Sequence, residues 1–287
     1  MRAYYLIFRV LYSLIQNLSL DVVLGAVVIS WLTAKSLGKS IVPEIYLIQA
    51  LCVWVIYTLD HLLDAKKINQ KAKTRRHLFH QKYFDPLAIS VVIATGVCFL
   101  LCFRYLPKQT WNWGLIIAGF SALHLFIAYY LGKAKSRWTM KELIIAINYS
   151  AGIFVASASI KTQIKEIDLF LFLLLTGVAF MNLVMYSFFD LEKDFKHDQN
   201  SIAVSFGAKA TQKILTTLFW LILITGCGGL LLFNDANPYQ LFYMCFMICI
   251  GLLYYLMILL IDRNYISESY RRIGDLVFII PIILPLF

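Results

Sequence analysis

The chain has 287 residues, of which 61% are hydrophobic, and its mean hydropathy is +0.75. This composition excludes an ordinary water-soluble domain and predicts a membrane protein. The net charge of +10 would suggest nucleic-acid binding in a soluble protein. The sequence shows no aromatic-rich basic motif of a nucleic-acid module, however, so we expect no nucleic-acid partner. All six cysteines fall inside apolar runs, where we expect them to pack as small apolar residues.

Apolar runs close to the ~20 residues that a helix needs to cross a bilayer recur along the whole chain. They predict an all-α polytopic membrane protein, with its transmembrane helices bundled in a single domain, residues 1–287. The nine predicted spans cover residues 18–37, 42–63, 86–106, 111–131, 142–160, 168–189, 210–233, 239–261 and 273–287. The first residues show no small-residue cleavage pattern, so we expect no cleaved signal peptide.

Lysine and arginine residues are unevenly distributed between successive loops. If the N-terminus lies inside the cell and nine spans follow, the inside segments hold most of the 26 Lys and Arg residues. Because such residues concentrate in cytoplasmic loops, the pattern predicts an integral protein of the cell (inner) membrane with a cytoplasmic N-terminus. The ends of the second and sixth spans then also lie on the cytoplasmic face.

Acidic residues mark the end of the sixth predicted span. Residues 186–207 read YSFFDLEKDFKHDQNSIAVSFG, in which Asp190, Asp194 and Asp198 recur every fourth residue. Side chains four residues apart share a helix face, so these carboxylates repel one another unless a cation lies among them. The pattern favours Mg²⁺, because this ion takes oxygen ligands and commonly shares them with a substrate phosphate.

A shorter acidic cluster ends the second span, where residues 57–65 read YTLDHLLDA and contain Asp60 and Asp64. If the two span ends face each other across a central cavity that opens at the cytoplasmic face, their carboxylates could hold Mg²⁺ ions that bind a diphosphate. A single acidic pair at a membrane surface is more simply solvated and paired with nearby lysines. Two clusters on one face of the membrane favour a functional site.

Basic side chains near these clusters would bind the leaving diphosphate. The candidates are Arg75, Arg76, Lys133, Lys135 and Lys193. The apolar bundle would hold a long hydrocarbon tail away from water. Together these features predict the ionisation of an allylic diphosphate, whose carbocation is captured by an acceptor.

The two acidic motifs resemble those of the UbiA superfamily of integral-membrane prenyltransferases. Asp60 and Asp64 match the acids of its first motif, Asn-xxx-Asp-xxx-Asp, and Asp190 and Asp194 match its second, Asp-xxx-Asp. Residues 201–207, SIAVSFG, look similar to the segment that follows the second motif. The resemblance implies a nine-helix bundle with a cavity open to membrane lipid, catalysis by these four acids, and Mg²⁺ as cofactor. It also implies transfer of a prenyl group from a polyprenyl diphosphate to a small aromatic, quinone-precursor-like acceptor or to a lipid.

Ile56 stands where the first motif of the family has Asn. This departure leaves a catalytically inactive relative as one alternative function. A secondary transporter, whose acids would bind protons or cations, is another alternative. Transporters usually place such residues near the middle of the membrane between broken helices, whereas the acids here lie at span ends.

Polar residues in or next to the spans are candidates to line the cavity or contact the acceptor. They are Asn17, Asp21, Tyr57 and Tyr186. Asp21 could equally be an acid in the first turn of a helix, which the helix dipole favours. Asn182 is expected to form an interhelical hydrogen bond, and Asp275 is expected to be a first-turn acid of the last helix.

Overall fold

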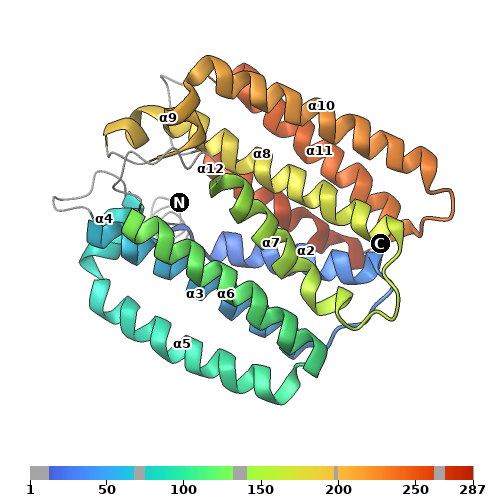
Figure 1. Ribbon diagram of the computed structural model, residues 1–287, viewed down its shortest axis with the longest axis horizontal. Coiled ribbons are helices and arrows are strands. Elements are labelled where there is room, and N and C mark those ends of the chain that lie inside the picture. Colours follow the sequence, from blue (N-terminus) through green and yellow to red (C-terminus); the bar gives the residue numbers. More distant parts are fainter. Residues whose placement is uncertain (1–12, 68–74, 132–140, 197–199, 262–268, 287) are drawn as a thin grey trace, which may run out of the picture.

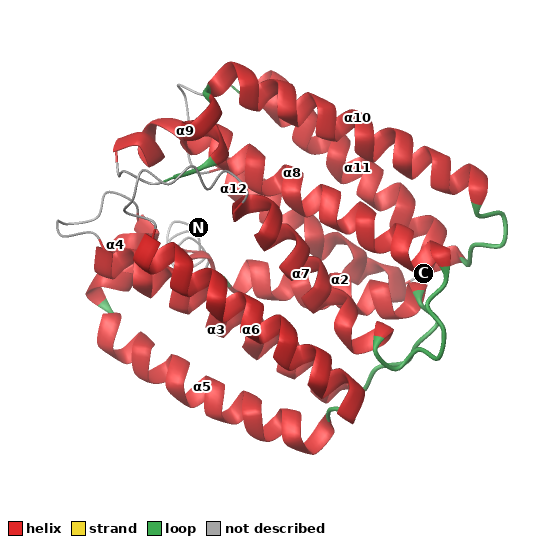
Figure 2. Cartoon of the chain, viewed as in Figure 1, coloured by secondary structure: helices red, strands yellow, loops and turns green. Residues whose placement is uncertain are grey.

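The computed structural model describes residues 13–67, 75–131, 141–196, 200–261 and 269–286. The fold is 89% helix, with no strand among the described residues, which confirms the all-α class (Figure 2). The helices are α2 (Leu20–Ser36), α3 (Pro43–Lys67), α4 (Arg75–Lys82), α5 (Phe84–Tyr105), α6 (Lys108–Leu131), α7 (Lys141–Ala158), α8 (Glu166–Lys196), α9 (Ile202–Phe206), α10 (Ala208–Leu232), α11 (Pro238–Leu260), α12 (Ser269–Leu276) and the 3₁₀ helix η2 (Val277–Leu286) (Figure 1).

Seven of the nine predicted spans correspond to helices that are long and apolar enough to cross a membrane. These are α3, α5, α6, α7, α8, α10 and α11 among the described residues. The first predicted span corresponds to α2, which has 17 residues and is therefore about 26 Å long.

The last predicted span, residues 273–287, differs from the expectation of a transmembrane α-helix. It begins inside α12, which ends at Leu276, and continues as the ten-residue 3₁₀ helix η2. Pro281 and Pro285 fall in this segment and have no backbone N–H to donate to an α-helical hydrogen bond. A 3₁₀ helix of this length covers about 20 Å, which is shorter than the ~30 Å hydrocarbon core of a bilayer.

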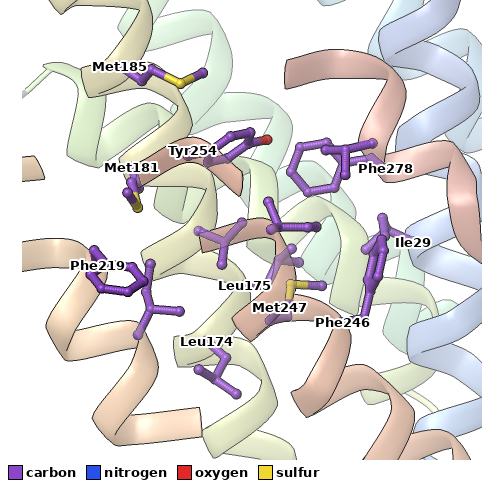
Figure 3. Packing of buried hydrophobic residues seen from close by; sticks show 14 of the residues in the cluster. Ile29, Leu174, Leu175, Met181, Met185, Phe219, Phe246, Met247, Tyr254 and Phe278 are labelled. Carbon is purple, nitrogen blue, oxygen red and sulfur yellow. The ribbon is translucent and has the colours of Figure 1, made fainter. Parts of the chain in front are cut away.

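Helix α8 is the centre of the bundle. In the most apolar 18-residue stretch of α8, 61% of the residues are buried, whereas the corresponding share is 17% in both α5 and α6. It packs against α7 on one side and against α10 and α11 on the other (Figure 1). Figure 3 shows Leu174, Leu175 and Met181 of α8 in the core with Phe219 of α10 and Met247 of α11.

The outer helices expose apolar side chains that only a lipid environment would accommodate. Ile93, Leu100 and Phe103 of α5 are 61%, 69% and 83% exposed. Such a continuous apolar surface would not be stable in water, because its exposure forfeits the free energy of burial. The chain is therefore an integral membrane protein.

Helices α3 and α8 end at the same end of the bundle. Figure 1 shows α4, which follows α3, and α9, which follows α8, at this end. With 31 residues, α8 is about 46 Å long, which exceeds the ~30 Å hydrocarbon core. Its last turns, which carry the acidic motif, therefore extend beyond the apolar region, and we call this the acidic end of the bundle.

Candidate active site

Asp190 lies at the acidic end of α8 and is 4% exposed. Its Oδ1 accepts a hydrogen bond from Tyr270 Oη at 2.6 Å and pairs with Lys193 Nζ at 3.1 Å. Its Oδ2 accepts from Arg271 Nε at 3.2 Å and Nη2 at 2.5 Å. Two cations and one phenol thus surround a buried carboxylate, which stabilises its charged form.

Tyr270 and Arg271 belong to α12 and were not predicted to be part of the site. Tyr270 is fully buried, and its ring packs against Phe189 with 4.9 Å between ring centroids. Burial raises the pKa of the Tyr270 phenol above its ordinary value, so the hydroxyl stays protonated and donates to Asp190. The only signal in the sequence was the Arg271–Arg272 pair that precedes the last apolar run.

A second set of hydrogen bonds joins α12 to α8 one turn deeper in the bundle. Tyr186 Oη donates to Asp275 Oδ1 at 2.7 Å, and Asn182 Nδ2 donates to Tyr254 Oη of α11 at 2.7 Å. Asn182 Nδ2 and Tyr254 Oη also donate to the carbonyl oxygen of Gly274, at 3.3 Å and 2.9 Å. The interhelical hydrogen bonding expected of Asn182 is confirmed. The expected first-turn position of Asp275 is wrong, because α12 begins at Ser269 and ends one residue after Asp275.

Gly274 permits the close approach of α12 to α8. A Cβ atom at this position would collide with Tyr186 Oη and would lie 3.0 Å from Cε1 and 3.1 Å from Cζ of the same ring. Any larger residue would therefore displace the phenol from Asp275.

Asp194 lies one turn beyond Asp190, near the end of α8 at Lys196. The Ser201 hydroxyl is within hydrogen-bond reach of its carboxylate, and the Ser201 Oγ also accepts from the backbone N–H of Val204 at 3.4 Å. Glu142 Oε1 accepts from the N–H of Ile202 at 3.0 Å, and a further buried bond runs from the N–H of Ala203 to Ser187 Oγ at 2.9 Å. Side chains of α7 and α8 thus satisfy the first N–H groups of α9 and hold the start of this helix in place.

A small cavity of about 40 Å³ lies between the helices on the inner side of this site. Its lining residues are Val22, Gly25, Tyr57, Ile145, Ala146, Tyr149, Ala179, Asn182, Leu183, Asp275 and Phe278. Tyr57 is one turn before Asp60 on α3, and Asn182 is two turns before Asp190 on α8. Both acid-bearing helices therefore line the same cavity. Asp60 and Asp190 come after the cavity-lining residues of their helices and so lie nearer to the acidic end.

The first acidic cluster lies on the last turns of α3, where Asp60 and Asp64 are both partly exposed. A surface groove of about 320 Å³ opens beside them between α3 and α6. Its lining residues are Leu63, Lys66, Leu125, Phe126 and Tyr129. The groove is apolar apart from a lysine and a phenol.

The remaining predicted site residues lie outside the cavity lining or outside the part of the chain that the structure describes. Arg75 and Arg76 begin α4, but their side chains are not described; Lys133, Lys135 and Asp198 lie outside the described residues. Asn17 is partly exposed and donates to Ser13 Oγ at 3.5 Å. Asp21 is buried in the first turn of α2, and neither residue is among the described residues that line the cavity.

The oxygen donors at the acidic end suit Mg²⁺ in kind, since this ion prefers carboxylate oxygens. Among the described residues, no three or more His, Cys, Asp or Glu side chains come close enough together to hold a metal ion. Mg²⁺ is usually bound by one or two carboxylates together with waters and substrate phosphates. The residues therefore fit a site in which a substrate supplies part of the coordination.

Comparison with known proteins gives the family and the fold of the chain. The sequence model of the UbiA prenyltransferase family matches residues 5–279. The chain belongs to the UbiA prenyltransferase family. Its fold is similar to that of a UbiA homolog from Archaeoglobus fulgidus bound to DMAPP and Mg²⁺, with a TM-score of 0.64, 11% sequence identity, and coverage of 93% of this chain and 97% of that chain. Comparison with curated proteins gives no match.

Membership of the UbiA family confirms the resemblance that the paired acidic motifs indicated. It also gives the activity at the level of the family, which is prenyl transfer within a membrane.

Proposed function

We propose that this UbiA-family protein transfers a prenyl group from an allylic polyprenyl diphosphate to a small aromatic, quinone-precursor-like acceptor in the membrane, with Mg²⁺ as cofactor. The observation that carries the proposal is the position of Asp190, held by Arg271, Tyr270 and Lys193 at the end of a helix that lines an internal cavity. The DMAPP and Mg²⁺ bound to the homolog from Archaeoglobus fulgidus support the choice of substrate class and metal.

Each group of residues has a role in this proposal. Mg²⁺ would neutralise the charge that develops on the departing diphosphate. The carboxylates that would hold the metal are Asp60, Asp64, Asp190, Asp194 and Asp198. The basic side chains that would bind the diphosphate are Arg75, Arg76, Lys133, Lys135 and Lys193.

The cavity and its surroundings would receive the two hydrophobic reactants. Tyr57, which lines the cavity, and Tyr186 would contact the acceptor. Asn17, which precedes α2, and Asp21, in the first turn of α2, are further candidates. The apolar walls exclude water, which protects an allylic cation from hydrolysis. The hydrocarbon tail would extend along apolar surface toward membrane lipid.

The acidic end is proposed to face the cytoplasm at the inner cell membrane, because the basic loops predict this orientation. Transport is less compatible with the fold. Helices α3 and α8 are continuous over 25 and 31 residues, whereas transporter sites usually lie between broken helices near the middle of the membrane.

The experiment is an assay of the purified chain in lipid nanodiscs, with an allylic diphosphate, Mg²⁺ and a panel of phenolic acceptors. We expect Asp190→Asn and Asp60→Asn to lower turnover by about two orders of magnitude or more, since each removes a charged metal ligand. Asp235→Asn is the matched control, because Asp235 is an exposed acid between α10 and α11 at the other end of the bundle. Full turnover in either of the first two variants would remove the basis of the proposal.

A further inference from the structure

The donors around Asp190 fill the positions that a metal ion would need. A carboxylate offers about four lone-pair positions. Four donor atoms already face it, namely Arg271 Nε and Nη2 at Oδ2, and Tyr270 Oη and Lys193 Nζ at Oδ1. Coordination of Mg²⁺ by Asp190 therefore requires that at least one of these donors leaves.

Arg271 is the donor that can leave Asp190 with the least loss of packing, and its departure exposes the most of the carboxylate. Tyr270 is fully buried against Phe189 and is fixed by that contact. The Arg271 side chain is 39% exposed and supplies both hydrogen bonds to Oδ2, so its movement alone frees a whole oxygen atom. Lys193 shares Oδ1 with Tyr270, and its departure would leave that oxygen still occupied.

A displaced Arg271 needs an anion as its new partner. Its guanidinium lies 5.1 Å from the ring centroid of Tyr186 and 5.9 Å from that of Tyr270, which keeps it next to Asp190. Mg²⁺ at Asp190 would repel a guanidinium at this distance unless an anion lay between them. A guanidinium presents paired N–H groups that match two oxygens of a phosphate, so the diphosphate of the substrate is the anion that fits.

We propose that Arg271 competes with Mg²⁺ for Asp190 Oδ2 and becomes a ligand of the diphosphate when Mg²⁺ takes that oxygen. This inference rests on the proposed function, since it concerns the same diphosphate. It assigns to the α12 segment a binding role that the acidic motifs and the basic loops do not include.

The rest of α12 stays in place while the Arg271 side chain moves. The hydrogen bonds of Tyr186 with Asp275, and those of Asn182 and Tyr254 with the Gly274 carbonyl, hold α12 without involving the guanidinium. Only side-chain torsions of Arg271 need to change. Because each of Mg²⁺ and diphosphate then removes an obstacle to the other, the two bind cooperatively.

The test is calorimetric titration of the purified full-length chain in detergent, first with MgCl₂ alone and then with inorganic pyrophosphate at saturating Mg²⁺. In Arg271→Gln we expect Mg²⁺ alone to bind about tenfold more tightly, since its competitor is gone, and pyrophosphate to bind about tenfold more weakly, since a ligand is lost. A residue that only supports the structure would weaken both. Arg271→Lys keeps the positive charge but lacks the paired N–H groups of the guanidinium, so its affinity for pyrophosphate should lie between those of the wild type and Arg271→Gln.

Arg272→Gln is the matched control, because it removes the same charge from the adjacent position of α12, about 100° around the helix. We expect both of its affinities to equal those of the wild type. An unchanged pyrophosphate affinity in Arg271→Gln, or a parallel loss of both affinities, would overturn the inference. If Arg271→Gln does not purify as a folded protein, Arg271→Lys decides, and wild-type pyrophosphate affinity in that variant overturns it. Failure of the wild type to bind Mg²⁺ and pyrophosphate would instead refute the proposed function.

Discussion

A methyl group added at Gly274 would test how α12 is docked on α8. In Gly274→Ala the new Cβ atom would collide with Tyr186 Oη and lie 3.0 Å from Cε1 of that ring. The ring cannot stay where it is, because Cβ contacts this short are essentially never tolerated. We therefore expect Tyr186 to move away from α12 and to lose its 2.7 Å hydrogen bond to Asp275.

Two effects determine how much unfolding free energy Gly274→Ala should lose. Overpacking of a close-packed site costs about 1–3 kcal/mol. A hydrogen bond to a charged group is worth about 1.5–3 kcal/mol. Because moving the ring relieves part of the overpacking while breaking the bond, the two costs overlap, and we expect a total of about 2–4 kcal/mol.

The assay is equilibrium unfolding in mixed micelles, with Gly119→Ala as control. Gly119 lies in α6 with no atom within 4 Å of the position a Cβ would take, so alanine there should be neutral or stabilising by up to about 1 kcal/mol. The double variant Tyr186→Phe with Gly274→Ala lacks the hydroxyl oxygen that lies closest to the new Cβ. Its loss of unfolding free energy should therefore be smaller than the sum of the losses in the two single variants. A Gly274→Ala protein within about 0.5 kcal/mol of the wild type would refute the reasoning.

Two further predictions concern contacts away from the metal ligands. Lys161→Ala removes the ion-pair partner of the Asp168 carboxylate, which is 2% exposed and lies at the other end of α8. We expect a loss of about 3 kcal/mol in unfolding free energy and an unchanged affinity for pyrophosphate. A weakened pyrophosphate affinity at wild-type stability would contradict this. Ser187→Ala leaves the buried N–H of Ala203 without its acceptor, at a cost of about 1–3 kcal/mol. Hydrogen exchange of residues 202–206 should accelerate, and wild-type exchange rates there would count against the role of Ser187.

The membrane helices could be predicted because their signal is local. A run of apolar residues long enough to cross a bilayer is sufficient to specify a buried helix in lipid, whatever its neighbours are. The segment 273–287 shows where this reasoning stops, because it is as apolar as the other spans yet continues as a 3₁₀ helix after Leu276. Hydropathy does not register the hydrogen bonds that Pro281 and Pro285 cannot donate.

The candidate acids could be picked out from the sequence, but the contacts that Tyr270 and Arg271 make with Asp190 could not. The spacing of Asp190 and Asp194 is visible within a single helical repeat. Tyr270 and Arg271 follow Asp190 by 80 and 81 residues, and only the packing of α12 against α8 brings them together. A tyrosine and an arginine before an apolar run are ordinary membrane-interface residues in a sequence, so nothing local distinguished them.

The four-residue spacing also extends further along α8 than the acidic motif itself. Asn182 and Tyr186 precede Asp190 at the same interval, and all three contact α12. Each step of four residues rotates about 40° around a helix of 3.6 residues per turn, so the stripe winds around α8 as it nears the acidic end. Asp194 consequently faces Ser201 before α9, while Asp190 faces α12. Among the described residues, no three His, Cys, Asp or Glu side chains come together. In the proposed site a substrate diphosphate would therefore supply the remaining ligands of the metal.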